Sequence, residues 1–332
     1  MFADARRREE RLTSGLKGPR CEAPAPNSRP GASARPALRS KRPAPPRPAQ
    51  AQSVNPAILP FTPPYDRSAV AILFARLCLA AGPLAMAVFS REDQGARLKS
   101  DASPVTEADE AVEAFLLGEL SRLTPQAPCI AEESAARGET PAQQGAFILI
   151  DPLDGTREFI ARRREFTINI ALVEQGEPRA GAVYAPALGE LWFAGEAAFH
   201  VAAEPGAPLP EPAQWRRLAT RPAPKDGLAA MVSVSHFDAE TKEFLERLPI
   251  KAQLQAGSSL KFCRIAEGLA DVYPRFGPTH EWDTAAGDAV LRAAGGAVLT
   301  PQGAPLAYGK AAQNYRNGPY VACGDKALAR LF

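Results

Sequence analysis

The stretch FILIDPLDGTREFI, residues 147–160, raises the question on which the fold depends. Four apolar residues lead directly into Asp151 and Asp154, which lie three positions apart and are followed by Gly155 and Thr156. An apolar run of this length is typical of a buried strand, whereas carboxylates are costly to bury unless they are paired. The stretch therefore predicts either a turn whose aspartates cap their own backbone or a site where a cation neutralises them.

The composition is that of a soluble globular protein, with 45% hydrophobic and 23% charged residues. The formal net charge of +2 is unevenly distributed, because residues 1–50 carry twelve Lys and Arg against four Asp and Glu. A basic N-terminal segment therefore precedes an acidic body. The five cysteines are scattered, with no C-x-x-C pair and no histidine at ligand spacing, which argues against a disulfide framework and a zinc site. We expect a cytoplasmic location.

Residues 1–65 are rich in Pro, Ala and Arg and show no apolar period, so we predict a disordered tail. The tail has no continuous apolar run and is not expected to be a secretory signal peptide. Such a basic arm either contacts nucleic acid or an anionic membrane surface, or has no binding function. The second interpretation is simpler, and no nucleic-acid partner is expected.

The first long apolar run, residues 69–89, has the length of a membrane span. Arg76 lies near its middle and Pro83 follows, and a charge at the bilayer centre costs about 3 kcal/mol on insertion scales. We therefore predict a buried first helix of a soluble domain, kinked or broken near Pro83.

From residue 66 to the C-terminus the sequence predicts one folded body. Strands are predicted in CIAEES, in FILID, in a meander over residues 166–195 and in MVSVSH. Helices are predicted over residues 258–273 and 282–296, the second ended by two glycines. This irregular alternation indicates layered helices and sheets of the α+β class rather than a uniform β-α-β chain.

A further helix is predicted to begin after Thr106. Asp109, three positions later, completes a capping-box pattern. The helix has an apolar face made of Val112, Phe115, Leu116, Leu120 and Leu123.

Acidic residues follow several of the apolar elements. Glu132 and Glu133 end one predicted strand, Asp151 and Asp154 end another, and Asp283 begins a helix. If these ends converge, the carboxylates repel one another unless a cation such as Mg²⁺, which prefers oxygen ligands, lies among them. The backbone N–H groups of the Gly-Thr pair then offer a close approach to an anion. The pattern points to metal-assisted hydrolysis of a phosphate ester.

Three separated motifs, DPLDGT, AEES and WDTAAGDAVLRAAGG, resemble the inositol monophosphatase superfamily of Mg²⁺-dependent, lithium-sensitive phosphatases. The resemblance runs from about residue 66 to the C-terminus. KSDASPVTEAD, EFTINIAL and GSSLKFCRIAEGLADVYPRFGPTHEWDTAAG are similar, more narrowly, to 3′(2′),5′-bisphosphate nucleotidases of the bacterial CysQ type. The implied fold is an α-β-α-β-α sandwich with a metal-binding half at about 66–205 and a second half at about 206–332. The implied substrate is adenosine 3′,5′-bisphosphate (PAP), with its phosphosulfate analogue (PAPS) as a second candidate, in sulfur assimilation.

The resemblance also implies roles for individual residues. It implies two Mg²⁺ ions, whose ligands are Glu132, Asp151, the Leu153 carbonyl, Asp154 and Asp283. A third Mg²⁺ ion, bound more weakly, is implied near Asp109. Thr156 and Asp109 match the dyad that activates the attacking water, and Glu132 completes the catalytic set. The implied substrate-binding residues are Gly155, Thr156, His236, Ser258, Lys261, Arg275 and Asp283.

Several alternatives stay open at this stage. Asp109 also has a role as a helix cap. Lys261 is alternatively a solvated charge on a helix, and His236 is alternatively a hydrogen-bond donor with a structural role. A broader sugar or inositol phosphatase competes with the nucleotidase, as does a nucleic-acid- or membrane-binding protein with an inactive phosphatase body. Family relatives suggest a peripheral place on the cytoplasmic face of the inner membrane, and monomer and homodimer are both open.

Overall fold

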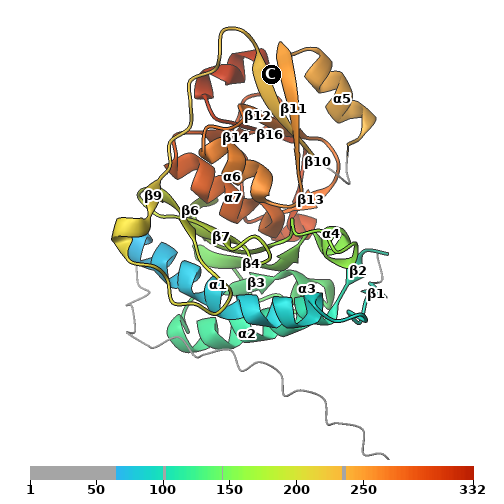
Figure 1. The fold of residues 1–332 in the computed structure, drawn as a ribbon, viewed down its shortest axis with the longest axis vertical. Coiled ribbons are helices and arrows are strands. Elements are labelled where there is room, and N and C mark those ends of the chain that lie inside the picture. The colour runs from blue at the N-terminus through green and yellow to red at the C-terminus, as the bar shows by residue number, and fades with distance from the viewer. Residues whose placement is uncertain (1–64, 100–101, 144, 234–236) are drawn as a thin grey trace, which may run out of the picture. The chain divides into compact units, whose positions relative to one another are not determined.

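The computed structural model describes residues 65–99, 102–143, 145–233 and 237–332. The predicted tail lies outside these residues except for Tyr65, and so does His236. The described residues contain two main sheets, each flanked by helices (Figure 1).

The first sheet has seven strands in the order β3-β4-β5-β6-β7-β8-β9. Only β3 and β4 are parallel, and the other neighbours pair antiparallel. Strands β5 to β7 form the meander that the sequence predicts over residues 166–195. The strands are β3 Cys129–Ala131, β4 Ala146–Asp154, β5 Thr167–Glu174, β6 Glu177–Ala185, β7 Glu190–Ala194, β8 Ala198–Ala202 and β9 Arg216–Arg217.

The second sheet has five strands in the order β11-β10-β12-β16-β14. These are β10 Leu228–Ser233, β11 Ile250–Ala256, β12 Val272–Arg275, β14 Ala297–Leu299 and β16 Tyr320–Cys323. Two small ribbons complete the strands: β1 Arg97–Leu98 with β2 Pro104–Val105, and β13 Thr279–His280 with β15 Arg316–Asn317.

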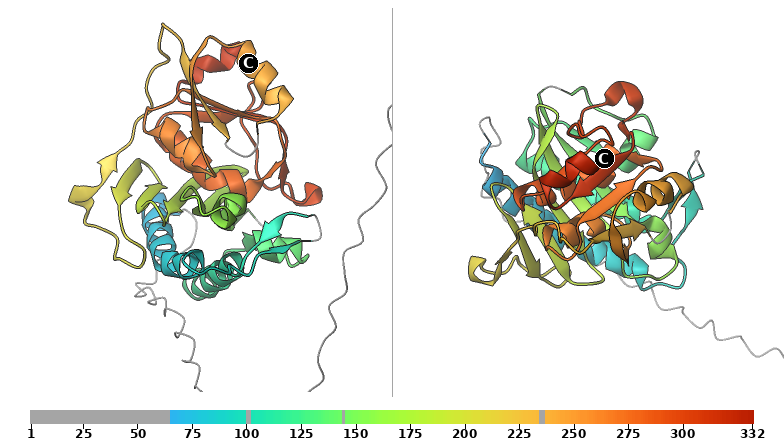
Figure 2. Two further views of the ribbon diagram at one scale, coloured as in Figure 1. Left: turned by 45° about the vertical axis from the view of Figure 1, so that its right-hand side comes forward. Right: turned by 90° about the horizontal axis from the view of Figure 1, so that it is seen from above.

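The helices form three layers around the two sheets (Figures 1 and 2). Helices α1 (Arg67–Phe89) and α2 (Glu107–Leu123) pack on one face of the first sheet, and α6 (Leu260–Ala266) and α7 (Glu281–Ala293) lie between the sheets. Helix α5 (Ala239–Glu246) packs on the outer face of the second sheet. The short helices α3 (Glu132–Ala136) and α4 (Thr156–Ile160) follow β3 and β4. The arrangement confirms the expected α-β-α-β-α sandwich.

Helix α1 is long and apolar enough to cross a membrane, but about half of its apolar window is buried inside the protein. It packs against α2, β6 and β7, and Arg76 lies on its exposed side. The sequence predicts a kink or a break near Pro83, and a break is wrong, because the helix continues through this residue to Phe89. Proline has no N–H for the Leu79 carbonyl one turn earlier, and the Gly206 N–H donates to that carbonyl instead, at 2.8 Å.

Two further predictions concern helix ends. The capping box of α2 is present as predicted, with Val112, Leu116, Leu120 and Leu123 buried. The helix predicted over residues 258–273 ends at Ala266, so its second half was wrong. Gly268 adopts a φ of +75°, a left-handed conformation that terminates helices, and the following residues form β12.

Candidate active site

A cavity of about 740 Å³ opens where the strand ends of the first sheet meet α6, α7 and the second sheet. Its lining includes all but two of the site residues predicted from the sequence. Asp109 lies outside the lining but contacts it through Thr156, and His236 is not among the described residues.

Three carboxylates from distant points of the chain meet in this cavity. One oxygen of each of Glu132, Asp151 and Asp283 lies within 4.8 Å of the others. The parallel pairing of β3 and β4 sets Ala131 beside Ile150, so that Glu132 and Asp151 emerge together at the next position. Asp283 comes from the first turn of α7, where its carboxylate also accepts from the His280 N–H at 2.8 Å.

Two carboxylates of this cluster, Asp151 and Asp283, are poorly compensated by the protein. Burial raises the pKa of Asp151 well above its usual value, and the charges of Glu132, Asp154 and Asp283 raise it further. The pKa of Asp283 is raised for the same reasons, with Asp154 and Glu132 as its acidic neighbours. Such concentrated negative charge on oxygen ligands fits a hard divalent cation.

Asp154 lies on the same strand as Asp151 and faces Ser259. The Ser259 Oγ lies 3.0 Å from Asp154 Oδ2 and 2.8 Å from the Asp283 carbonyl oxygen, and it accepts from Asn169 Nδ2 at 3.1 Å. Burial raises the pKa of Asp154 to about 6, although the Lys261 charge and the Ser259 hydroxyl oppose this shift. Ser259 thus connects an acidic residue of β4 with the start of α7, a role that the sequence analysis missed.

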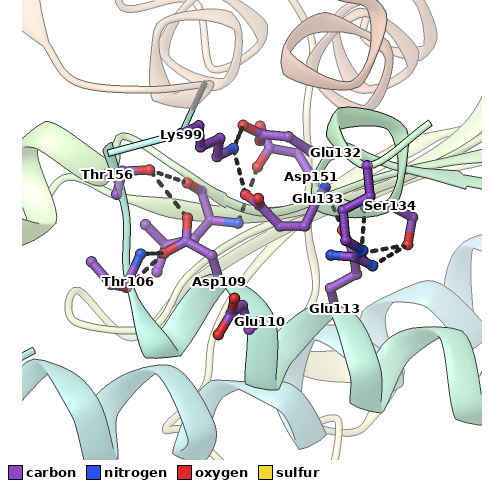
Figure 3. A network of polar contacts seen from close by, with 12 residues as sticks. Lys99, Thr106, Asp109, Glu110, Glu113, Glu132, Glu133, Ser134, Asp151 and Thr156 are labelled. Carbon is purple, nitrogen blue, oxygen red and sulfur yellow. Dashed lines mark hydrogen bonds and ion pairs between the residues drawn. The ribbon is translucent and has the colours of Figure 1, made fainter. Parts of the chain in front are cut away.

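Lys99 is the counter-charge of the two glutamates (Figure 3). Its Nζ lies 2.6 Å from Oε1 of both Glu132 and Glu133. Burial raises the pKa of Glu133 to about 7, reinforced by Glu132 and opposed by Lys99. Lys99 was not predicted as a site residue, although it begins the KSDASPVTEAD motif.

The Thr156 hydroxyl contacts two predicted site residues (Figure 3). It lies 3.2 Å from Asp109 Oδ1 and 3.2 Å from the Leu153 carbonyl oxygen. The turn before it depends on Gly155, because its φ is +91° and a Cβ here would lie 3.2 Å from the Glu165 carbonyl.

Asp109 makes both the capping contact and the contact with Thr156, two roles that do not exclude each other. It accepts from the Thr106 N–H at 2.8 Å and the Thr106 hydroxyl at 2.6 Å while its other oxygen faces Thr156. Burial raises the pKa of Asp109 to about 6, with the Thr106 hydrogen bonds opposing the shift and the Glu132 charge adding to it.

The predicted substrate residues of the second half line the same cavity. Lys261 is only 4% exposed, so the alternative of a solvated charge was wrong. Its Nζ donates to the carbonyls of Ala256 and Ser258 at 3.3 and 2.6 Å, and it lies 5.1 Å from the Tyr273 ring centroid. Ser258 has a φ of +45°, and Arg275 is 7% exposed with Nη2 donating to the Pro278 carbonyl at 3.2 Å.

Cys78, Cys129, Cys263 and Cys323 are free, and burial raises the pKa of each thiol.

Comparison with known proteins identifies the family of this chain. The sequence model of the inositol monophosphatase family matches residues 66–327. The chain belongs to the inositol monophosphatase family. It is 45% identical over 210 residues to the 3′(2′),5′-bisphosphate nucleotidase CysQ of Escherichia coli K12, covering 63% of this chain and 81% of that protein. The corresponding CysQ of Haemophilus influenzae is 31% identical over 243 residues, or 72% of this chain and 87% of the relative.

Solved structures of this family have a similar fold. The crystal structure of CysQ from Bacteroides thetaiotaomicron matches with a TM-score of 0.64 and 33% identity, covering 78% of this chain and 98% of that one. An inositol monophosphatase from Zymomonas mobilis matches with a TM-score of 0.63 and 25% identity, over 80% and 96% of the two chains. These matches confirm the fold and the family. The division into halves near residue 205 stays a prediction.

Proposed function

We propose that the chain is a 3′(2′),5′-bisphosphate nucleotidase that hydrolyses the 3′-phosphate of PAP to give AMP and phosphate, and that also accepts PAPS. The observation that carries the proposal is the meeting of Glu132, Asp151 and Asp283 in one cavity with the cationic side chains Lys261 and Arg275. The first group suits divalent cations and the second suits a substrate with two phosphates. The CysQ relatives act on this class of nucleotide, as their names state.

The cluster offers carboxylate oxygens, the type of donor atom that Mg²⁺ prefers. The family is metal-dependent, and we propose two ions held by Glu132, Asp151, Asp154, Asp283 and the Leu153 carbonyl, with a third, weaker ion near Asp109. When bound, such ions lower the pKa of a water molecule and stabilise the oxygen that leaves the phosphate. The raised pKa values of Asp151 and Asp283 support this assignment, because they reflect burial together with repulsion from neighbouring carboxylates, which a bound cation would relieve.

Thr156 and Asp109 orient the attacking water in this proposal. When the Thr156 hydroxyl donates to Asp109, its oxygen lone pairs are available to accept a hydrogen bond from water. As the water attacks phosphorus, Thr156 accepts its proton and passes its own to Asp109. The Asp109 pKa of about 6 suits a group that gains and loses a proton near neutral pH. Thr106 holds the carboxylate in place and so limits the orientations of the dyad.

The second half supplies the substrate contacts. We propose that Arg275 and Lys261 attract the phosphates, that Ser258 and His236 contact the nucleoside, and that the backbone N–H groups of Gly155 and Thr156 face the phosphate to be cleaved. The Lys261 ammonium donates hydrogen bonds to two carbonyls of the loop 256–258. It therefore stabilises the conformation of the loop and places a positive charge next to it. The Ser258 Oγ is buried without a hydrogen-bond partner, as expected of a group that awaits a ligand.

A phosphate-release assay over PAP, PAPS, 3′-AMP and inositol 1-phosphate, with and without Mg²⁺ and Li⁺, tests the proposal. We expect kcat/KM for PAP to exceed that for inositol 1-phosphate by about 100-fold or more, equivalent to about 3 kcal/mol of transition-state binding. Equal rates would support a broader sugar phosphatase. No Mg²⁺-dependent turnover of any ester would leave the alternative of an inactive body with a basic binding tail.

The proposal extends to partners and location. A nucleotide is the expected ligand, no nucleic acid is expected to bind, and the enzyme is proposed to be cytoplasmic, with peripheral membrane attachment as an additional feature to test. Size-exclusion chromatography with light scattering separates monomer from homodimer.

A further inference from the structure

Helix α3 begins at Glu132, a residue of the acidic cluster, and its first N–H groups have no hydrogen-bond partners within the helix. It has five residues, Glu132–Ala136, and its N-cap residue Ala131 makes no side-chain cap. The first N–H groups of a helix have no partner within the helix, and leaving them buried and unpaired costs free energy. The position of Glu132 therefore depends on the group that accepts hydrogen bonds from the N–H groups in the first turn of α3.

Glu113 of α2 accepts hydrogen bonds from the N–H groups of that turn (Figure 3). Its Oε2 accepts from the Glu133 N–H at 2.7 Å, and its Oε1 accepts from the Ser134 N–H at 2.8 Å and the Ser134 hydroxyl at 2.7 Å. The Glu113 side chain is 3% exposed, and Arg137 Nη2, at the end of α3, lies 3.5 Å from it. Three hydrogen bonds to one buried carboxylate make a rigid connection between α2 and α3.

The same helix carries the proposed water-orienting dyad. Glu113 follows Asp109 by four residues, which places both on one face of α2. Asp109 contacts Thr156 on α4, and Glu113 contacts the backbone of α3 directly after Glu132. Helix α2 thus fixes two parts of the site relative to each other, although neither of these two side chains bonds to the Glu132 carboxylate.

We propose that Glu113 is a positioning residue that holds Glu132 in the geometry required for metal binding, acting through the backbone of α3. The inference rests on the proposed function, because it takes Glu132 as a metal ligand. It predicts that the loss of Glu113 weakens metal binding to the folded protein. Residues that orient metal ligands typically change metal affinity by about 10- to 100-fold when they are replaced.

Glu113→Gln is the sharpest variant, because it keeps the volume of the side chain. One carboxylate oxygen becomes an NH₂ group, which cannot accept from the α3 N–H groups or stabilise them. Ser134→Ala removes only one of the three hydrogen bonds and should have a smaller effect in the same direction. Glu110→Gln is the matched control, since Glu110 lies on the exposed side of the same helix and pairs with Arg97. Asp151→Asn serves as the variant without a working metal site.

Mn²⁺ binding to the intact chain, measured by isothermal titration calorimetry without substrate, gives a readout independent of turnover. We expect the Mn²⁺ dissociation constant to rise about 10-fold in Glu113→Gln, with a parallel rise in the Mg²⁺ concentration for half-maximal activity and little change in kcat at saturating Mg²⁺. Glu110→Gln should match the unmodified protein.

Unchanged Mn²⁺ affinity in Glu113→Gln would overturn the inference, even if this variant unfolds at lower urea concentration, because that pattern describes a purely structural contact. If Glu113→Gln does not fold, Ser134→Ala decides, and wild-type Mn²⁺ affinity in it counts equally against the inference. If Asp151→Asn also binds Mn²⁺ normally, the metal assignment itself fails rather than the role of Glu113.

Discussion

Replacing Asp151 with Asn removes one negative charge from the centre of the acidic cluster and changes little else. The Leu153 N–H donates to Asp151 Oδ1 at 3.0 Å, and an Asn Oδ1 can accept the same hydrogen bond. The variant should therefore fold. Without metal it should be more stable than the unmodified chain, because the repulsion with Glu132 and Asp283 is reduced.

The size of this stabilisation follows from the geometry. At the outer limit of 4.8 Å and an effective dielectric constant of about 20, the repulsion of one pair of charges costs about 3.5 kcal/mol. Burial and the neighbouring carboxylates raise the pKa values of Asp151 and Asp283, which favours proton binding, and a carboxyl that binds a proton avoids part of this repulsion. We therefore expect Asp151→Asn to stabilise the metal-free protein by about 1–3 kcal/mol at pH 8.

Urea unfolding at pH 8, in EDTA and in Mg²⁺, measures both consequences. The unmodified chain should gain about 1.4 kcal/mol at a Mg²⁺ concentration ten times its dissociation constant, and the variant should gain almost nothing. PAP hydrolysis should be abolished. A variant that is less stable than the unmodified chain in EDTA, or one with an undiminished Mg²⁺ response, would refute the reasoning.

Four further predictions follow from the site. Because the pKa values of Asp109 and Asp154 are raised to about 6, the folded metal-free protein binds more protons than the unfolded chain. Its free energy of unfolding, measured by urea titration, should therefore fall as the pH rises from about 4 to about 7. The fall should be less steep in Asp151→Asn. Thr156→Val should lower kcat about 100-fold while Mn²⁺ affinity measured by calorimetry stays unchanged. Lys261→Met should raise KM for PAP about 10-fold, equivalent to the loss of about 1.4 kcal/mol in binding, whereas KM for a substrate with one phosphate should change less. Deletion of residues 1–60 should leave kcat/KM unchanged, and a loss of activity would give the tail a role in catalysis.

Much of the site could be predicted from the sequence because its acidic residues stand at the ends of apolar elements. Asp151 follows an unbroken apolar run, and Glu132 and Asp283 lie at similar boundaries, so convergence was a reasonable expectation. The pairing that causes it, Ala131 beside Ile150, depends on strand register across the intervening residues and could not be obtained from either segment alone.

The residues that the sequence analysis missed act through contacts over long separations in the chain. Lys99 reaches Glu132 across 33 positions, and Ser259 reaches Asp154 across 105. No local pattern distinguishes Ser259, whose Oγ lies beside Asp154, from Ser258, whose φ is positive and whose Oγ has no hydrogen-bond partner.

Helix ends show the same limit. The capping box of α2 is local and was predicted correctly. The continuation of α1 through Pro83 depends on Gly206, which is more than a hundred residues away and satisfies the freed Leu79 carbonyl. A local pattern identifies the proline but not the distant partner that makes it tolerable in the helix interior.

The central claim is that Glu132, Asp151, Asp154 and Asp283 hold divalent cations. Anomalous diffraction from crystals of the enzyme soaked in Mn²⁺ tests it most directly. We predict two strong anomalous peaks among these four carboxylates, with the Leu153 carbonyl beside one of them. A fully soaked crystal with no peak among them would contradict the account.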